Sequence, residues 1–160
     1  MLRLERIGGE NADEIAALAV SDEQKLFVSD NAQSLAEAAV ANNSGGHAFP
    51  FGVYDGGEAV RFVMVGFGTD DEWADPPEIA KDSYNIWRLM IDKNHQGKGF
   101  GKGALALALE FIKTFPCGEA GLCWVSYVPE NEAAKRLYGS FGFAETGETI
   151  DGEVIAALGL

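Results

Sequence analysis

The sequence predicts an α/β (α+β) fold with a mixed, mostly antiparallel sheet of about six to seven strands and helices on both faces. The prediction rests on the order of the elements, on two hairpin signals and on a glycine-rich loop between a strand and a helix. A chain of 160 residues with a hydrophobic content of 47 % suits a single domain with a full core. We therefore treat residues 1–160 as one domain.

The first half of the chain predicts a strand, a helical region and a hairpin. In order, the elements are a strand at 2–7, a helix at 11–20, helix starts at 21–24 and 34–37, and strands at 48–54 and 59–67. Both helix starts match the capping box, in which a Ser side chain and a following Glu or Gln side chain satisfy free backbone N–H groups. The run Asp55-Gly56-Gly57-Glu58 between the two strands favours a tight antiparallel hairpin.

The second half of the chain predicts two strand–helix units and a closing hairpin. In order, the elements are a loop at 70–82, a strand at 84–92, a glycine-rich loop at 96–103, a helix at 104–115, a strand at 122–128, a helix at 131–140, and strands at 141–150 and 153–158. Six acids and two prolines favour a surface loop at 70–82. Asp151-Gly152 is a favoured turn pair between the last two strands.

The charge of the chain limits its partners. Twenty-five acids against 12 basic residues give a net charge of −13, which opposes binding to nucleic acid and favours a cationic partner. Residues 88–136 hold seven basic residues and five acids, a net charge of +2, whereas the rest of the chain holds 20 acids and five basic residues, a net charge of −15. We expect two electrostatic faces, although an acidic surface also serves solubility alone.

The composition also indicates the cellular compartment in which we expect the protein. No apolar run approaches the roughly 20 residues that span a bilayer, and the start MLRLERIGGE lacks a signal-peptide pattern. Cys117 and Cys123 are too few for a disulfide scaffold and show no metal-ligand spacing with His47 or His95. We expect a cytoplasmic protein with buried thiols, no bound metal, and no membrane or nucleic-acid partner. The sequence leaves a homodimer open.

The glycine-rich loop carries the first chemical signal. Glycines alternate at positions 97, 99, 101 and 103, so consecutive backbone amides can point into one concavity and bind an anion such as a pyrophosphate. The helix that follows adds free N–H groups and the positive end of its dipole, and Lys98 and Lys102 add charge.

Two nucleotide-binding motifs compete with this interpretation. A P-loop is excluded, because no Ser or Thr follows Lys102 in the required place. A dinucleotide-binding loop at Gly99-x-Gly101-x-x-Ala104, with Glu119 on the ribose, fits the pattern of residues. The antiparallel hairpin that precedes the loop argues against the dinucleotide-binding fold.

The glycine-rich loop and its strand resemble part of the GNAT family of N-acetyltransferases. The run 89–101 is similar to the family's strand and acetyl-CoA pyrophosphate loop. The core of that loop is Arg or Gln, then Gly, then Gly or Ala, which Gln96, Gly99 and Gly101 match. The resemblance implies the GNAT fold, with acetyl-CoA as co-substrate and no metal.

A second run strengthens the resemblance. Residues 129–143 are similar to the family's later motif, in which a helix begun by Asn, here Asn131, carries a Tyr, here Tyr138. Within the family, the runs 34–38 and 87–92 resemble bacterial spermine/spermidine acetyltransferases. The cofactor-binding residues implied by both motifs are Leu89, Met90, Ile91, Gln96, Gly97, Lys98, Gly99, Phe100, Gly101, Lys102, Asn131 and Tyr138.

Physical chemistry gives these residues roles. The resemblance implies that the backbone at 89–91 pairs with the acetyl-pantetheine arm as an added strand would. Asn131 and Tyr138 lie two helical turns apart, so they share one helix face about 10 Å from each other. A phenol with a pKa near 10 is suited to protonate the departing thiolate, so we expect Tyr138 to be the general acid. Simple packing of Tyr138 and an N-cap role for Asn131 are the ordinary alternatives.

The expected reaction is acetyl transfer to a primary amine, with a small polyamine such as spermidine or spermine as the acceptor. The alternatives are another amine, such as a protein N-terminus or an aminoglycoside, or an acetyl-CoA sensor without catalysis. The residues expected near the acceptor are Asp22, Glu23, Trp87 and Arg88.

The acceptor amine must lose a proton before it attacks, at a cost of about 4 to 5 kcal/mol near pH 7 for an alkylamine. The candidate bases are Asp22, Glu23, Asp82 and Glu153. The chain departs from many GNAT members at Gln96, where Arg is common, and at Arg61, where Gly is common. We expect Arg61 to narrow or recharge the acceptor site.

Overall fold

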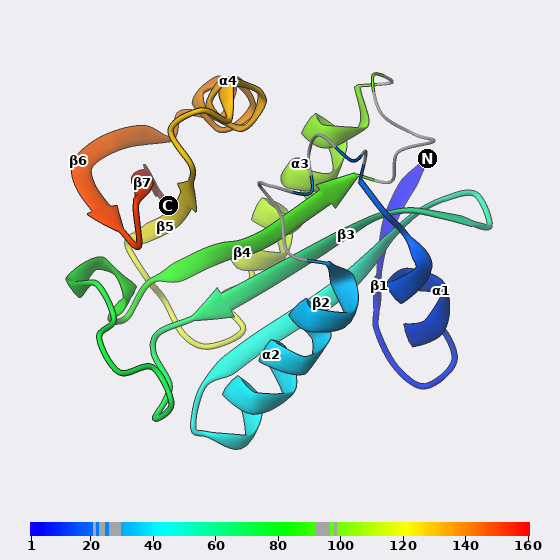
Figure 1. Ribbon diagram of the computed structural model, residues 1–160, viewed down its shortest axis with the longest axis horizontal. Coiled ribbons are helices and arrows are strands. Elements are labelled where there is room, and N and C mark those ends of the chain that lie inside the picture. Colours follow the sequence, from blue (N-terminus) through cyan, green and yellow to red (C-terminus); the bar gives the residue numbers. More distant parts are fainter. Residues whose placement is uncertain (21, 23–24, 26–29, 92–96, 98) are drawn as a thin grey trace.

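The computed structural model describes residues 1–20, 22, 25, 30–91, 97 and 99–160. Seven strands form one sheet in the order β1-β2-β3-β4-β5-β7-β6 (Figure 1). The strands are β1 (Leu2–Arg6), β2 (His47–Asp55), β3 (Glu58–Phe67), β4 (Tyr84–Ile91), β5 (Leu122–Tyr127), β6 (Ala144–Ile150) and β7 (Glu153–Gly159). Neighbouring strands run antiparallel except β4 and β5, which are parallel. The mixed, mostly antiparallel sheet predicted from the sequence is confirmed.

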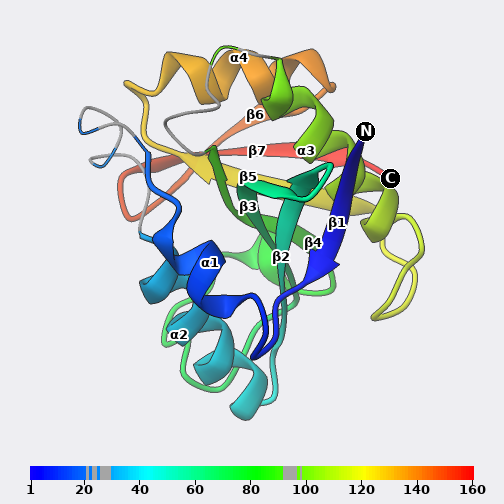
Figure 2. The same ribbon diagram turned by 90° about the vertical axis from the view of Figure 1, so that its right-hand side faces the viewer.

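Helices cover both faces of the sheet. They are α1 (Ala12–Ala17), α2 (Asn31–Asn43), α3 (Phe100–Ile112) and α4 (Glu132–Ser140), with a short 3₁₀ helix at Glu78–Ala80. Figure 2 shows α1 and α2 on one side of the sheet and α3 and α4 on the other. We call these two sides the α2 face and the α3 face.

Alternating side chains of β3 build a core on each face. Val63 and Val65 join Leu105 of α3 in one cluster, whereas Phe62 and Met64 belong to the cluster under α1 and α2. All five side chains are fully buried. Burying one such side chain contributes about 1.5 to 3 kcal/mol to the stability of the fold. The packed central strands therefore fix the positions of the residues at their ends.

β4 and β5 separate soon after they meet. Their pairing covers Tyr84 with Cys123 and Asn85 with Trp124, and the Asn85 amide donates to the Trp124 carbonyl oxygen at 3.0 Å. Beyond this point β4 remains paired with β3 and β5 with β7, and the two strands diverge (Figure 1). In the described strands, the edge of β4 from 86 to 91 therefore forms no ladder with β5.

A β-bulge in β4 lies beside this opening. The register pairs Met64 with Arg88 and Val65 with Ile86. Trp87 is therefore an extra residue on β4, and the side-chain alternation shifts by one. As a result Trp87 and Arg88, which are consecutive, both lie on the α2 face. A regular strand would send them to opposite faces.

Turn chemistry predicted both hairpins correctly, since β2 pairs with β3 and β6 with β7. Asp151 and Gly152 have φ values of 48° and 80°, the left-handed conformation that the tight turn needs. The helix predicted at 131–140 is α4. Asn131 is its N-cap, with a side-chain oxygen that accepts from the Ala134 N–H at 3.1 Å.

The predicted capping box at 34–37 is wrong. α2 begins at Asn31, and Asp30 caps it by accepting from the Gln33 N–H at 2.7 Å. Ser34 lies inside the helix, where its hydroxyl donates to the Asp30 carbonyl oxygen at 3.1 Å. Asp and Ser are both good N-caps, so Asp30, four residues earlier, begins the helix instead. The other predicted helix start, at 21–24, lies outside the described residues except for Asp22.

The glycine-rich loop is shorter than predicted, because α3 begins at Phe100 instead of 104. Gly101, Lys102 and Gly103 lie in the first turn of the helix. A Cβ at Gly103 would collide with the Leu2 side chain, so this glycine lets β1 approach α3 closely. At other ends the differences are small: α1 is shorter than the predicted helix at 11–20, and β6 begins at 144 instead of 141.

Two expectations about solubility and thiols can also be compared with the structure. Both cysteines are free thiols, but only Cys123 is buried, and Cys117 is partly exposed. Among the described helices, none combines the length and the apolar composition needed to cross a membrane.

Candidate active site

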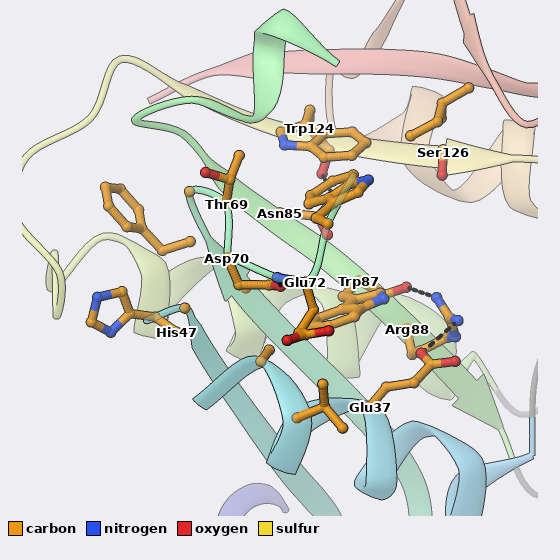
Figure 3. Close-up of a pocket in the computed structure, with 18 of the residues that line it drawn as sticks. Glu37, His47, Thr69, Asp70, Glu72, Asn85, Trp87, Arg88, Trp124 and Ser126 are labelled. Carbon is orange, nitrogen blue, oxygen red and sulfur yellow. Dashed lines mark hydrogen bonds and ion pairs between the residues drawn. The ribbon is translucent and has the colours of Figure 1, made fainter. Parts of the chain in front are cut away.

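A cavity of about 660 Å³ opens on the α2 face, where β4 and β5 diverge (Figure 3). Its walls come from α2, the start of β2, the end of β3, the loop at 68–73, β4, β5 and the β6–β7 hairpin. All three tryptophans of the chain line it, namely Trp73, Trp87 and Trp124. Five carboxylates line it as well: Glu37, Asp70, Glu72, Asp151 and Glu153. This lining suits a small cationic ligand with an apolar stem.

The tryptophans form the apolar part of the wall. Trp73 and Trp124 stack with ring centroids 6.4 Å apart and an interplanar angle of 26°. Trp87 both packs against the core of the α2 face and faces the cavity, so core and lining roles coexist. An indole face attracts an ammonium group by about 0.5 to 2 kcal/mol. The rings and the carboxylates therefore favour the same class of ligand.

Arg88 is the one Lys or Arg side chain among the described residues that line the cavity. Its guanidinium pairs with the Glu37 carboxylate at 3.0 Å and donates to the Trp87 carbonyl oxygen at 3.0 Å (Figure 3). The partner of Arg88 thus comes from α2. Because Glu37 neutralises Arg88, the four other carboxylates leave the cavity acidic.

Glu153 is the candidate base that the structure brings into the cavity. It lies at the start of β7, where burial raises the pKa of its carboxyl group above the ordinary value. The positive charge of Arg88 and a hydrogen bond with the Ser126 side chain oppose that rise, and Asp151 adds to it. A raised pKa brings a carboxylate closer to the range in which it exchanges protons near neutral pH.

The other candidate bases lie elsewhere. Asp22 is almost fully exposed and pairs with Lys25 at 2.8 Å, away from the cavity lining. Asp82 is exposed in the turn before β4 and also lies outside the lining. Glu23 lies outside the described residues. The structure therefore places Trp87 and Arg88 at this cavity, but not Asp22.

Five of the residues expected to bind the cofactor, Gly97, Gly99, Phe100, Gly101 and Lys102, lie just before α3 or in its first turn. Gly97 and Gly99 have φ values of 77° and 71°, a left-handed conformation that strains other residues. Gly99 is the N-cap of α3, followed by Phe100, Gly101 and Lys102 in the first turn. The amides of that turn have no partner within the helix and carry its positive dipole end, so they suit a phosphate. Gln96 and Lys98 lie outside the described residues.

The expected backbone contacts lie on β4. The side chain of Leu89 packs against the core of the α3 face, and Met90 is buried in the core of the α2 face. Ile91 pairs with Arg61 on β3. The opposite backbone edge of these residues faces the opening, so an extended arm can pair there as an added strand.

Tyr138 lies on the α3 face and is 7 % exposed. Its ring stacks on Tyr127 at 6.0 Å and meets Phe143 edge-on at 5.5 Å. Burial raises the pKa of the Tyr138 phenol above its ordinary value, so the group stays protonated at neutral pH. Tyr138 can therefore pack in the core and still donate the proton of its phenol. Asn131, at the other end of the same helix, caps it as the sequence analysis allowed.

Arg61 lies outside the lining of this cavity. Its side chain is fully buried in β3, between Val53 and Ile91 in the register. Burial lowers the pKa of Arg61 to about 10, and Asp55 opposes that change. Even at this pKa the guanidinium keeps its charge at neutral pH.

The sequence analysis missed most of the lining. Trp124 and Trp73 lie in a predicted strand and a predicted loop and carried no motif, and Glu37 lies in the predicted capping box but was given no role at the site. The available signal was compositional: acids and a tryptophan cluster in 70–82. In the described part of the chain, no group of three or more His, Cys, Asp or Glu side chains could hold a metal ion.

The mixed sheet with its opening between β4 and β5, and the left-handed Gly97 and Gly99 before α3, fit the class expected from the sequence, an acetyl-CoA-dependent acyltransferase. Residues 12–143 match the model of the Acetyltransferase (GNAT) family, and the chain belongs to that family. It is thus an acetyltransferase, as the motifs in the sequence predicted.

Among curated proteins, the chain is similar to the spermine/spermidine N(1)-acetyltransferase of Bacillus subtilis strain 168, with 30 % identity over 152 residues. The match covers 92 % of this chain and 90 % of that protein. The probable spermine N(1)-acetyltransferase of Bacillus subtilis subsp. natto matches with the same identity and coverage.

Solved structures share the fold at low identity. The aminoglycoside acetyltransferase AAC(6')-Ib in complex with coenzyme A superimposes with a TM-score of 0.78 at 15 % identity, covering 99 % of this chain and 95 % of that one. The GNAT domain of S. lividans PAT has a TM-score of 0.72 at 16 % identity, covering 99 % and 90 %. The expected co-substrate, acetyl-CoA, agrees with the family and with the coenzyme A in the first of these structures.

Proposed function

We propose that the protein transfers the acetyl group of acetyl-CoA to a primary amine of a small polyamine such as spermidine or spermine. One observation carries the proposal: the cavity on the α2 face is lined by three tryptophans and five carboxylates, and its one described Lys or Arg side chain is already paired. The names of the curated relatives support the same acceptor.

The sheet separates the two substrates. Acetyl-CoA binds on the α3 face, with its pyrophosphate on the amides around Gly99 and the first turn of α3. Its acetyl-bearing arm pairs with the edge of β4 at 89–91, inside the opening between β4 and β5. The amine enters from the cavity on the α2 face and meets the thioester in that opening. Direct transfer follows, and no acetylated side chain is needed.

Each step of the transfer has a candidate residue. The neutral amine nitrogen attacks the thioester carbonyl carbon, and the carbon–sulfur bond breaks. Tyr138 protonates the departing thiolate, a task for which its buried and protonated phenol is suited. Asn131 fixes the start of the helix that carries Tyr138.

An acetyl-CoA turnover assay over a panel of amines tests this function. The panel contains spermine, spermidine, a diamine, a monoamine, kanamycin and a peptide with a free N-terminus. We expect the highest kcat/KM for the polyamines. Preference for kanamycin or the peptide would replace the acceptor with the corresponding alternative, and firm acetyl-CoA binding without any turnover would identify a sensor.

A further inference from the structure

We propose that Glu153 is the catalytic base that takes the proton from the attacking amine, an inference that rests on the proposed function. Glu153 lines the cavity at the start of β7. Of the candidate carboxylates on described residues, Asp22, Asp82 and Glu153, it alone lies in that lining.

The position of Glu153 follows from the divergence of the strands. Its neighbour Val154 pairs with Tyr127, the last residue of β5, so Glu153 lies just beyond the end of that strand. Arg88, on β4, lines the same cavity and interacts electrostatically with Glu153. The carboxylate therefore flanks the opening in which the amine and the thioester meet.

The groups around Glu153 set the proton affinity of its carboxylate. The Ser126 side chain of β5 and the positive charge of Arg88 of β4 both lower the pKa of Glu153, and Glu37 of α2 pairs with Arg88 at 3.0 Å. Asp151, in the turn of its own hairpin, adds a negative charge. Burial and Asp151 raise the pKa of Glu153, while Arg88 and Ser126 lower it.

The proton balance of the reaction is complete with Glu153 in this role. The nitrogen–carbon bond forms and the carbon–sulfur bond breaks. The ammonium form of the amine first releases one proton to solvent. As the neutral nitrogen attacks, its second proton passes to Glu153, directly or through one water, and the sulfur takes the proton of Tyr138. Solvent in the open cavity then removes the proton from Glu153, and a proton from solvent restores Tyr138.

The test replaces Glu153 with glutamine, which keeps the shape of the side chain and removes its basicity. With the best amine of the panel, kcat of Glu153→Gln should fall by about 100-fold or more, the usual contribution of a general base. The acid limb of the pH profile of kcat should disappear with it. Acetyl-CoA affinity and the melting temperature should stay at wild-type values. Glu148→Gln on β6, an exposed carboxylate outside the cavity lining, is the matched control and should retain wild-type kinetics.

A second variant tests proton transfer in a way that a merely structural role would not affect. Ser126→Ala removes the hydrogen bond that lowers the pKa of Glu153, so the acid limb of the pH profile should move to higher pH. The inference is overturned if Glu153→Gln keeps the wild-type kcat, if its defect lies only in the acceptor KM, or if the acid limb of Ser126→Ala stays in place. Wild-type protein that acetylates no amine would refute the proposed function and the role of Glu153 with it, whereas active wild type with an equally active Glu153→Gln refutes the role alone.

Discussion

Replacing Tyr138 with phenylalanine separates its two tasks. The ring is 7 % exposed, stacks on Tyr127 and meets Phe143, and phenylalanine keeps all of these contacts. Stability should therefore change by less than about 1 kcal/mol. Tyr138→Ala, which removes the ring, should cost about 3 to 5 kcal/mol and lower the melting temperature by roughly 6 to 20 °C. Thermal melts of both variants measure this contrast.

Steady-state kinetics of Tyr138→Phe test the catalytic role of Tyr138. Tyr138→Phe cannot protonate the thiolate, so kcat should fall by about 100-fold or more while acetyl-CoA affinity is retained. In the wild type, burial raises the pKa of Tyr138, so this group should produce no alkaline loss of activity below about pH 10. Wild-type kcat in the phenylalanine variant would refute the role of Tyr138 as the general acid. A large loss of stability in that variant would show that the phenol oxygen is needed for packing.

Three further predictions concern the two substrate sites. Gly99→Val should raise the acetyl-CoA Kd, measured by calorimetry, by about tenfold or more, because the left-handed backbone of Gly99 presents the loop amides. Gly147 on β6 also has a positive φ, so Gly147→Val is the control, which should lower stability but leave acetyl-CoA affinity unchanged. The KM for spermidine should rise with added salt, whose screening length is about 8 Å at physiological strength, and a monoamine should respond less, so equal responses in kinetic assays would contradict electrostatic attraction. Glu37→Gln leaves the charge of Arg88 unbalanced in the cavity and should raise the polyamine KM by about fivefold or more, with kcat nearly unchanged.

Local chemistry explains what the sequence predicted well. Asp151-Gly152 adopts the left-handed conformation that a tight turn favours, and Asn131 caps a helix with its own side chain. Both signals lie within a few residues of the structure that they determine. The capping box at Ser34 failed because it competes with Asp30, and nothing in the pattern ranks two adequate caps.

The acceptor cavity could not be predicted in the same way. Trp124 and Glu37 are 87 positions apart in the chain and share a cavity only because the sheet brings β5 and α2 together. The bulge at Trp87 adds a second obstacle, because period-2 alternation assigns Trp87 and Arg88 to opposite faces. Only the register between β3 and β4 reveals that both reach the cavity.

The short pairing between β4 and β5 divides the sheet into two leaves. One leaf, β1 to β4, carries Arg88, and the other, β5 to β7, carries Trp124 and Glu153. Among the described strands, the ladder between β4 and β5 joins the leaves at two residue pairs, so side-chain packing adds to the cohesion between them. Under the proposed function, a polyamine in the cavity contacts both leaves, and a ligand at 100 times its Kd adds about 2.7 kcal/mol to the stability of the folded state. The acceptor then stabilises the arrangement of the two leaves on either side of the opening.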